Sequence, residues 1–206
     1  MLAGRWHEPA FAAGGVRCAY DRAVDRSRIL VVAATVIELE WVVGVESLAV
    51  GVGPVEAALG TARRLAVDPP ALVLHVGIAG AKTASGIAIG EVVIGTESRY
   101  TDLNAEFPGL VKVCQPAADL LAQVAALLPD ARRLPIATTA FVGGGACDVE
   151  AMEGFSVLRA AARAGIPAVE VRTISNMVEE QDRRRWDFRA GLERIADVGR
   201  LLVAEL

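Results

Sequence analysis

Six short runs rich in Val, Ile and Leu, spread between residues 28 and 175, restrict the possible folds of this chain more than any other feature. The runs are RILVVAA, SLAVGVG, ALVLHVG, GEVVIGT, PIATTAF and PAVEVRTIS. Unbroken apolar runs of this length, most of them followed by alanine-rich stretches, are typical of strands buried on both faces of a parallel sheet. The pattern predicts a three-layer α/β/α fold around a central, mostly parallel mixed sheet.

Helix signals fill most of the spaces between these runs. Ala and Leu recur at helical spacing over residues 54–67, 116–128 and 153–164, and a last helix is expected at about 187–206. The first of these begins with a proline, which suits the first helical turn. The third ends at a glycine that a proline soon follows, a common helix stop.

The length and composition of the chain favour one domain. Its 206 residues, 53% of them apolar, can bury one sizeable core. We expect a single domain over residues 29–206, preceded by a flexible extension over residues 1–28 that lacks the apolar centre of a secretory signal. Gly, Pro or charged residues interrupt every apolar stretch before it reaches the roughly 18 residues of a membrane span, so no membrane partner is expected.

Charge argues against nucleic acid as a partner. The net charge is −4 and the pI is about 5.3, whereas sequence-independent binding of nucleic acid needs clustered Lys and Arg. The dense basic stretch, 183–185, is flanked by acidic residues and is interpreted as a mixed-charge surface. A small molecule is therefore the expected ligand.

Cysteine and histidine usage points to a cytoplasmic protein without a metal site. The three cysteines are widely spaced and form no CxxC pattern, which fits neither a disulfide framework nor a zinc site. Of the two histidines, His75 lies inside an apolar run and is expected to be a hydrogen-bonded strand residue. Neither a metal nor a cofactor is implied.

Several polar and glycine-rich segments fall at the predicted carboxyl ends of strands, where open α/β sheets bind ligands. We expect them to form one rim. GVGPVEAA and HVGIAGA place glycines directly after a strand, where a backbone can approach a ligand closely, but neither matches the GxGxxG dinucleotide pattern. The predicted rim segments are 35–38, 51–53, 77–80, 141–145 and 175–176.

Glu153 stands out because it interrupts an apolar run, EAMEGFSVL, at the predicted start of a helix. The helix dipole would stabilise its negative charge there. Two interpretations are equally supported by the local sequence. The carboxylate either caps the helix or accepts hydrogen bonds from a vicinal diol such as the 2′- and 3′-hydroxyls of a ribose.

Taken together and in order, the motifs resemble the nucleoside phosphorylase/nucleosidase superfamily, and most closely its futalosine hydrolases. The resemblance covers about residues 29–190. It rests on A-x-x-x-E at 34–38, GVGPVEAA at 51–58, GIAG at 77–80, IGEVVIGTE at 89–97, EAMEGF at 150–155, EVRTISN at 170–176 and DRRRW at 182–186. It implies a nucleoside phosphorylase-like fold, an N-glycosidase activity and a homodimer or larger homo-oligomer.

The resemblance also assigns roles to individual residues. Glu38 and Asn176 are the expected catalytic residues: Glu38 would orient or deprotonate the attacking water, and Asn176 would face the purine edge. Glu153 would take the ribose hydroxyls. The other expected substrate-binding residues are Ile78, Ala79, Gly80, Phe141, Val142, Met152, Arg172 and Ser175.

Asn176 bears on the choice of substrate. Relatives that cleave adenine nucleosides have Asp at the matching position, whereas an amide NH₂ can donate to O6 of hypoxanthine, so futalosine, an intermediate of menaquinone synthesis, is the expected substrate. GVGPVEAA contains no arginine to neutralise phosphate, which favours hydrolysis. Two alternatives stay open: a methylthioadenosine/S-adenosylhomocysteine-type nucleosidase, or a catalytically impaired nucleoside-binding remnant, since segments 39–50 and 143–151 are shorter than in the family.

Overall fold

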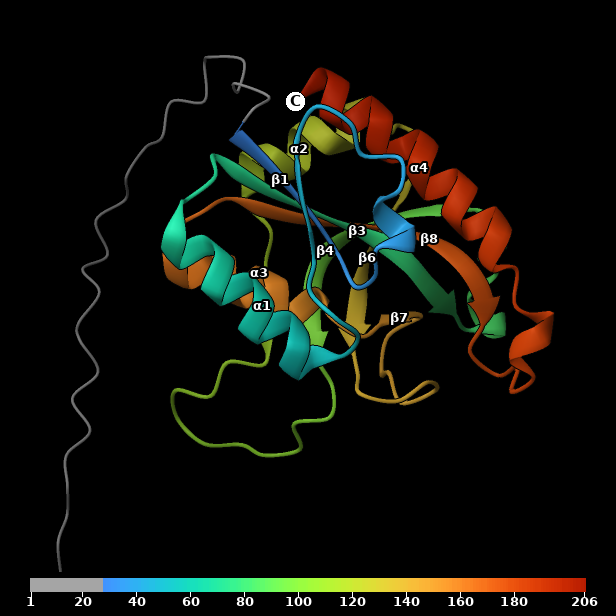
Figure 1. Ribbon diagram of the computed structural model, residues 1–206. Helices are drawn as coiled ribbons and strands as arrows, with labels where there is room; N and C mark the ends of the chain where they lie inside the picture. The colour runs from blue at the N-terminus through green and yellow to red at the C-terminus, as the bar shows by residue number, and fades with distance from the viewer. Residues whose placement is uncertain (1–27) are drawn as a thin grey trace, which may run out of the picture.

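The computed structural model describes residues 28–206 and is drawn in Figure 1. It contains strands β1 (Ile29–Ala33), β2 (Glu46–Ala49), β3 (Leu72–Ala81), β4 (Val92–Tyr100), β5 (Val113–Cys114), β6 (Arg132–Thr138), β7 (Val149–Ala151) and β8 (Ala168–Met177). The α-helices are α1 (Pro54–Val67), α2 (Ala118–Leu127), α3 (Gly154–Ala164) and α4 (Phe188–Glu205). The predicted extension, apart from residue 28, lies outside the described residues.

All six apolar runs form strands, as predicted. One detail of the prediction was wrong: the glycines of HVGIAGA do not follow a strand but lie inside one, because β3 continues to Ala81. The second half of β3 stays extended because it pairs with β7 on one side and β8 on the other. Asn176 likewise lies within β8. The short strand β5 has no counterpart among the predicted runs.

The strands form one mixed sheet in which most neighbours are parallel. Pairs β1–β2, β1–β3, β3–β8, β4–β6 and β6–β7 are parallel, and β3–β7, β4–β5 and β4–β8 are antiparallel. The pairing β3–β7–β6–β4–β8 returns to β3, so these strands close a ring, with β1 and β2 extending from one side and β5 from another.

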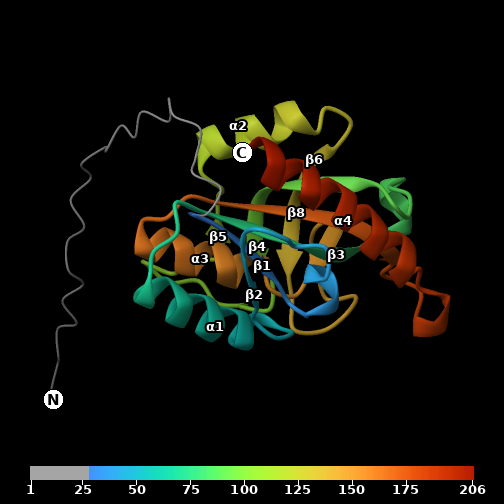
Figure 2. The ribbon, with the colours of Figure 1, turned by 45° about the horizontal axis from the view of Figure 1, so that its top comes forward.

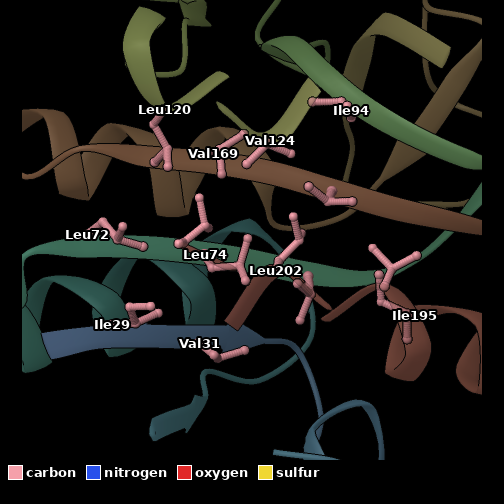
Figure 3. Packing of buried hydrophobic residues seen from close by; sticks show 14 of the residues in the cluster. Ile29, Val31, Leu72, Leu74, Ile94, Leu120, Val124, Val169, Ile195 and Leu202 are labelled. Carbon is pink, nitrogen blue, oxygen red and sulfur yellow. The ribbon is translucent and has the colours of Figure 1, made fainter. Parts of the chain in front are cut away.

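The helices cover the two faces of the sheet, which gives the predicted three layers (Figure 2). Helices α2 and α4 pack on one face against apolar side chains of β1, β3 and β8, among them Val31, Leu74 and Val169 (Figure 3). Helices α1 and α3 cover the other face with residues such as Ala57, Leu65 and Leu158. A third apolar cluster, including Ile136 and Ile174, lies among the strands of the ring.

The helix ends explain how two site segments are placed. Gly53, with φ of 95°, precedes Pro54 at the start of α1, so the chain turns sharply from β2 into the helix. Asp187 caps α4 by accepting a hydrogen bond from the Ala190 N–H at 2.9 Å.

Helix α2 begins at Ala118, two residues later than expected. No helix within residues 28–206 is both long and apolar enough to cross a membrane.

Candidate active site

A cavity of about 450 Å³ opens beside the ends of β1, β3, β7 and β8. The structure brings most of the predicted site residues to its walls, although they come from widely separated segments. Those lining the cavity are Glu38, Ile78, Ala79, Gly80, Phe141, Val142, Met152, Glu153, Ser175 and Asn176. The predicted rim is therefore one cavity, and Arg172 is the one predicted site residue that does not line it.

Glu38 lies at the base of the cavity, in a 3-10 turn (Ile37–Leu39) that follows β1. Its side chain is only 4% exposed, and three donors fix the carboxylate. Oε2 accepts from the backbone N–H and the hydroxyl of Thr35 at 2.9 and 2.8 Å, and Oε1 accepts from the Ile78 N–H at 3.1 Å. The two other acids nearby in sequence, Glu40 and Glu46, are exposed and do not line the cavity.

Glu153 is held by a partner far away in the sequence. Its Oε1 accepts a hydrogen bond from the Gly53 N–H at 3.0 Å, and the residue is 4% exposed. Glu153 occupies the N-cap position of α3, but its side chain makes no capping hydrogen bond there. The capping interpretation is therefore wrong. The carboxylate instead faces the cavity from the junction of α3 and the loop before α1.

Arg172 lies beneath this carboxylate rather than in the cavity wall, with only 1% of its surface exposed. Its Nη2 is 3.4 Å from Oε2 of Glu153, and its Nε donates to Oε1 of Glu170 at 2.9 Å. It also hydrogen bonds the ring Nε2 of His75. Arg172 is thus the cation of a buried network of charged side chains. Glu153 is the member of this network that lines the cavity.

Glycines make room for this network. A Cβ on Gly77 would lie 2.3 Å from Nη1 of Arg172 and 2.6 Å from Oε1 of Glu38. A Cβ on Gly154 would lie 2.1 Å from Oε2 of Glu170. Both glycines therefore permit close packing around buried charged side chains.

Burial and charge act in opposite directions on the pKa values of the network. Burial raises the pKa of the Glu153 carboxyl, and Arg172 and the Gly53 N–H offset part of that rise. Burial also opposes the charge of Arg172, but Glu170, Glu153 and Glu38 raise the pKa of its guanidinium, which keeps it protonated. The ring of His75, fully buried beside this cation, has a pKa well below its ordinary value of 6.5.

Lowering the pH from about 7 to about 5 is expected to destabilise the protein through His75. The unfolded chain takes up a proton below pH 6.5 that the folded ring does not accept. The free energy of unfolding should therefore fall with a slope approaching about 1.4 kcal/mol per pH unit. His75→Gln keeps an acceptor for Arg172 and should remove this slope. Urea unfolding across the pH range measures it, and an equal slope in both proteins would contradict the assignment.

His75 itself is a hydrogen-bonded residue of β3, as predicted. Its Nδ1 lies 3.0 Å from the carbonyl oxygen of Val32 on the neighbouring strand β1, so both ring nitrogens have partners. With Nδ1 donating to the carbonyl, Nε2 is the acceptor for the Arg172 guanidinium. A neutral histidine thus joins the sheet to the buried network.

Asn176 lies near the end of β8 and has a fixed amide. The hydroxyl of Ser175 donates to its Oδ1 at 2.9 Å, and its Nδ2 donates to the Met177 carbonyl at 3.2 Å. Because Oδ1 already accepts, Nδ2 is the donor left with a second hydrogen for a ligand. Asn176 is 5% exposed and lines the cavity.

The loop after β6 forms an open part of the cavity wall. The side chain of Phe141 is 61% exposed and that of Val142 is 38% exposed, although both line the cavity. Asp102 holds the start of this loop by accepting from Thr139 Oγ1 at 2.9 Å and from the Ala140 N–H at 2.6 Å. The shortened segment 143–151 adds no helix over this wall.

Some cavity residues were given no individual role by the sequence. Thr35 holds Glu38, and Glu150 reaches the cavity from β7. Arg183 and Trp186 line it from the segment before α4, with the guanidinium 5.6 Å from the indole centroid. The mixed-charge interpretation of 183–185 holds for Arg184 and Arg185, which pair with Asp182 and Glu180. The acidic character of EAMEGF was a usable signal for Glu150, because a second carboxylate in that motif also interrupts an apolar run.

No protein-family model matches the chain. It is 35% identical to the futalosine hydrolase of Streptomyces coelicolor over 187 residues, covering 77% of this chain and 78% of that protein. The chain belongs to the futalosine hydrolase family. Several of the motifs that indicated this family, at 34–38, 77–80, 150–155 and 170–176, contribute residues to the cavity.

Solved structures share the fold of this family member. The futalosine hydrolase of Helicobacter pylori strain 26695 superposes with a TM-score of 0.77 at 16% identity, covering 86% of this chain and 97% of that chain. The 5′-methylthioadenosine/S-adenosylhomocysteine nucleosidase of Neisseria meningitidis, in complex with methylthio-immucillin-A, also reaches 0.77 at 17% identity, covering 87% of this chain and all of that chain. These likenesses establish the nucleosidase-like fold.

Proposed function

We propose that this protein hydrolyses the N-glycosidic bond of a purine nucleoside, with futalosine as the substrate and hypoxanthine and dehypoxanthine futalosine as the products. One observation carries the proposal. Glu38, Glu153 and Asn176, which lie far apart in the sequence, line the same cavity in a member of the futalosine hydrolase family.

The chemistry of the three side chains suits this reaction. As the C1′–N9 bond breaks, positive charge develops on the sugar and negative charge on the purine. Carboxylates at Glu38 and Glu153 stabilise the first, and the Asn176 N–H donor stabilises the second. Water forms the new bond to C1′ and passes a proton to Glu38, which is held in place by Thr35 and Ile78. The electrons of the C1′–N9 bond leave with the purine, which departs as an anion hydrogen-bonded to Asn176 and takes up a proton from solvent to give hypoxanthine.

Glu153 is suited to hold the ribose. The Gly53 N–H occupies one acceptor position of its carboxylate, and Arg172 supports it from below. The remaining acceptor positions can take the 2′- and 3′-hydroxyls, and hydrogen bonds to a charged group contribute about 1.5–3 kcal/mol each. The neighbouring Met152 lines the same wall and would pack on the sugar.

The reaction is tested by incubating the purified protein with futalosine, with and without phosphate, and separating the products by chromatography. Hydrolysis predicts release of hypoxanthine at the same rate in both conditions. A strict requirement for phosphate would instead assign phosphorolysis. Cleavage of methylthioadenosine in preference to futalosine would assign the adenine-type activity.

Asn176→Asp is expected to shift the base preference toward adenine. A carboxylate facing O6 of hypoxanthine mispairs, whereas a protonated Asp can donate to N7 and accept from the 6-amino group of adenine. Mispairing of a buried polar group costs about 1–3 kcal/mol, so the ratio of kcat/KM for futalosine over methylthioadenosine should fall by about 10- to 100-fold. Asn104→Asp, at an exposed position away from the cavity, is the matched control and should keep the wild-type ratio.

The structure also favours one alternative outcome, nucleoside binding without turnover. Closed, dry sites strengthen electrostatic catalysis, but Phe141 leaves one wall of this cavity open to solvent. Folded protein that binds futalosine in calorimetry and releases no hypoxanthine would establish this alternative.

The setting of the activity is part of the proposal. Release of hypoxanthine from futalosine would place the protein in menaquinone synthesis, and Cys114 and Cys147, free thiols in the described chain, suit the reducing cytoplasm. A homodimer is supported by exposed apolar residues at and beside the cavity mouth, Ile37, Val52, Val55 and Leu59. Sedimentation equilibrium that finds only monomers would exclude this assembly.

A further inference from the structure

Glu150 is a buried cavity residue to which the mechanism above gives no role. It lies on β7, is 6% exposed and lines the cavity. Its backbone pairs directly with Gly80 of β3, and Gly80 pairs on its other side with Asn176 of β8. Glu150, Gly80 and Asn176 therefore form a row across three neighbouring strands.

This row has the dimensions of a binding site for the edge of a base. Two strand spacings separate the backbones of Glu150 and Asn176 by about 10 Å. Residues paired directly across strands point to the same face, and all three residues line the cavity. Gly80 has no side chain, so the Asn176 amide and Val178 pack closely against it, and the row carries one polar side chain at each end.

The amide at one end of the row is aimed along it. A Cβ added to Gly80 would lie 3.0 Å from Nδ2 of Asn176 and 2.9 Å from Cγ1 of Val178. Nδ2, rather than Oδ1, is therefore the amide atom closest to Gly80. This end of the row presents a hydrogen-bond donor, because Oδ1 is turned to the Ser175 hydroxyl.

The carboxylate at the other end presents only acceptors. Oε1 of Glu150 accepts from the Gly143 N–H at 2.5 Å, and Oε2 accepts from the Gly145 N–H at 2.8 Å. Each oxygen keeps a second acceptor position. Both partners are backbone N–H groups, and Gly145 packs so closely that a Cβ there would lie 2.8 Å from Oε2.

We propose that Glu150 accepts a hydrogen bond from N1–H of a 6-oxopurine, while Asn176 donates at the N7 and O6 edge of the same ring. The inference deepens the proposed function and rests on it for the placement of the purine. A 6-oxopurine carries a hydrogen on N1, whereas adenine has a lone pair there. A carboxylate attracts the N1–H group and repels the N1 lone pair. The site would therefore discriminate bases both at N1, through Glu150, and at the N7 and O6 edge, through Asn176.

Glu150→Gln separates this role from simple support of the loop. The Gln side chain keeps the size of Glu but offers an NH₂ that can donate to N1 of adenine. We expect kcat/KM for futalosine to fall at least about 10-fold, and that for the same nucleoside carrying adenine to stay constant or rise. Equal losses for both substrates would overturn the proposal and leave Glu150 as a loop support.

Asp102→Asn is the matched control for loop support. Asp102 also holds this loop, through Thr139 and Ala140, but does not line the cavity. Its substitution should impair both substrates by the same factor. Thermal unfolding of each variant shows that the comparison is made on folded protein.

Binding of free bases tests the proposal separately from hydrolysis. By calorimetry, the wild type should bind hypoxanthine more tightly than adenine and more tightly than 1-methylhypoxanthine, which has no N1–H. Glu150→Gln should reduce or reverse the preference for hypoxanthine over adenine. If the wild type releases no base but shows these binding preferences, the hydrolase function fails and the role of Glu150 stands. If it shows no such preference, or the variant retains it, the role of Glu150 fails.

Discussion

Glu38→Gln is expected to lower kcat for futalosine hydrolysis by about 10²- to 10⁴-fold, the usual contribution of a general base. The amide cannot take a proton from water. It also cannot accept all three hydrogen bonds that the carboxylate receives from Thr35 and Ile78, so a loss of about 1–3 kcal/mol of stability should accompany the change. The effect is measured as the rate of hypoxanthine release at saturating futalosine, with hypoxanthine quantified by chromatography.

Glu40→Gln is the control for this experiment. Glu40 is two residues away, exposed and outside the cavity, so its substitution should leave kcat unchanged. Circular dichroism establishes that both variants are folded. Full activity in the Glu38 variant would mean that another group activates the water, and the assignment of the general base would be abandoned.

Arg172→Met is expected to destabilise the protein by about 3–5 kcal/mol, which is typical when one partner of a buried ion pair is removed. The change leaves Glu153 and Glu170 without their shared cation, and Glu170 is fully buried. Met keeps most of the side-chain volume, so a void left by the substitution contributes little to the loss. Urea unfolding at neutral pH gives the difference in the free energy of unfolding.

Arg184→Met provides the comparison at the surface. Arg184 pairs with Asp182 but is exposed, and surface substitutions of this kind change stability by about 0.5 kcal/mol or less. In the Arg172 variant the destabilisation should shrink at mildly acidic pH, because burial raises the pKa of the Glu153 carboxyl and that group then takes up a proton. Equal stability of the two variants would show that the Arg172 network contributes nothing to folding.

The sequence predicted the fold well because local patterns determine most of it. Runs such as ALVLHVG have no polar alternation, so they indicate buried strands directly, and α1 has the predicted ends because Pro54 starts it. Helix α3 was also indicated, since Glu153 marks its predicted start and the helix begins at the next residue.

The site was predicted only in part, because its geometry depends on which strands become neighbours. Glu38 and Asn176 were recognised from family motifs, and the structure places both in the cavity. The position of Arg172 beneath the cavity, in contrast, depends on packing against His75 of β3, and the sequence pattern does not show that β3 and β8 are neighbours. The alignment of Glu150 with Gly80 likewise follows from an antiparallel pairing between distant segments, which no local periodicity encodes.

The residues that line the cavity span most of the described sequence, from Ala34, just after β1, to Leu192 in the second turn of α4. During synthesis the nascent chain therefore cannot form a complete binding site until α4 has left the ribosome and packed on β3 and β8. Ligands that bind this site should stabilise slow-folding or destabilised variants only after that step. A chain truncated before Trp186 should gain no thermodynamic stability from these ligands.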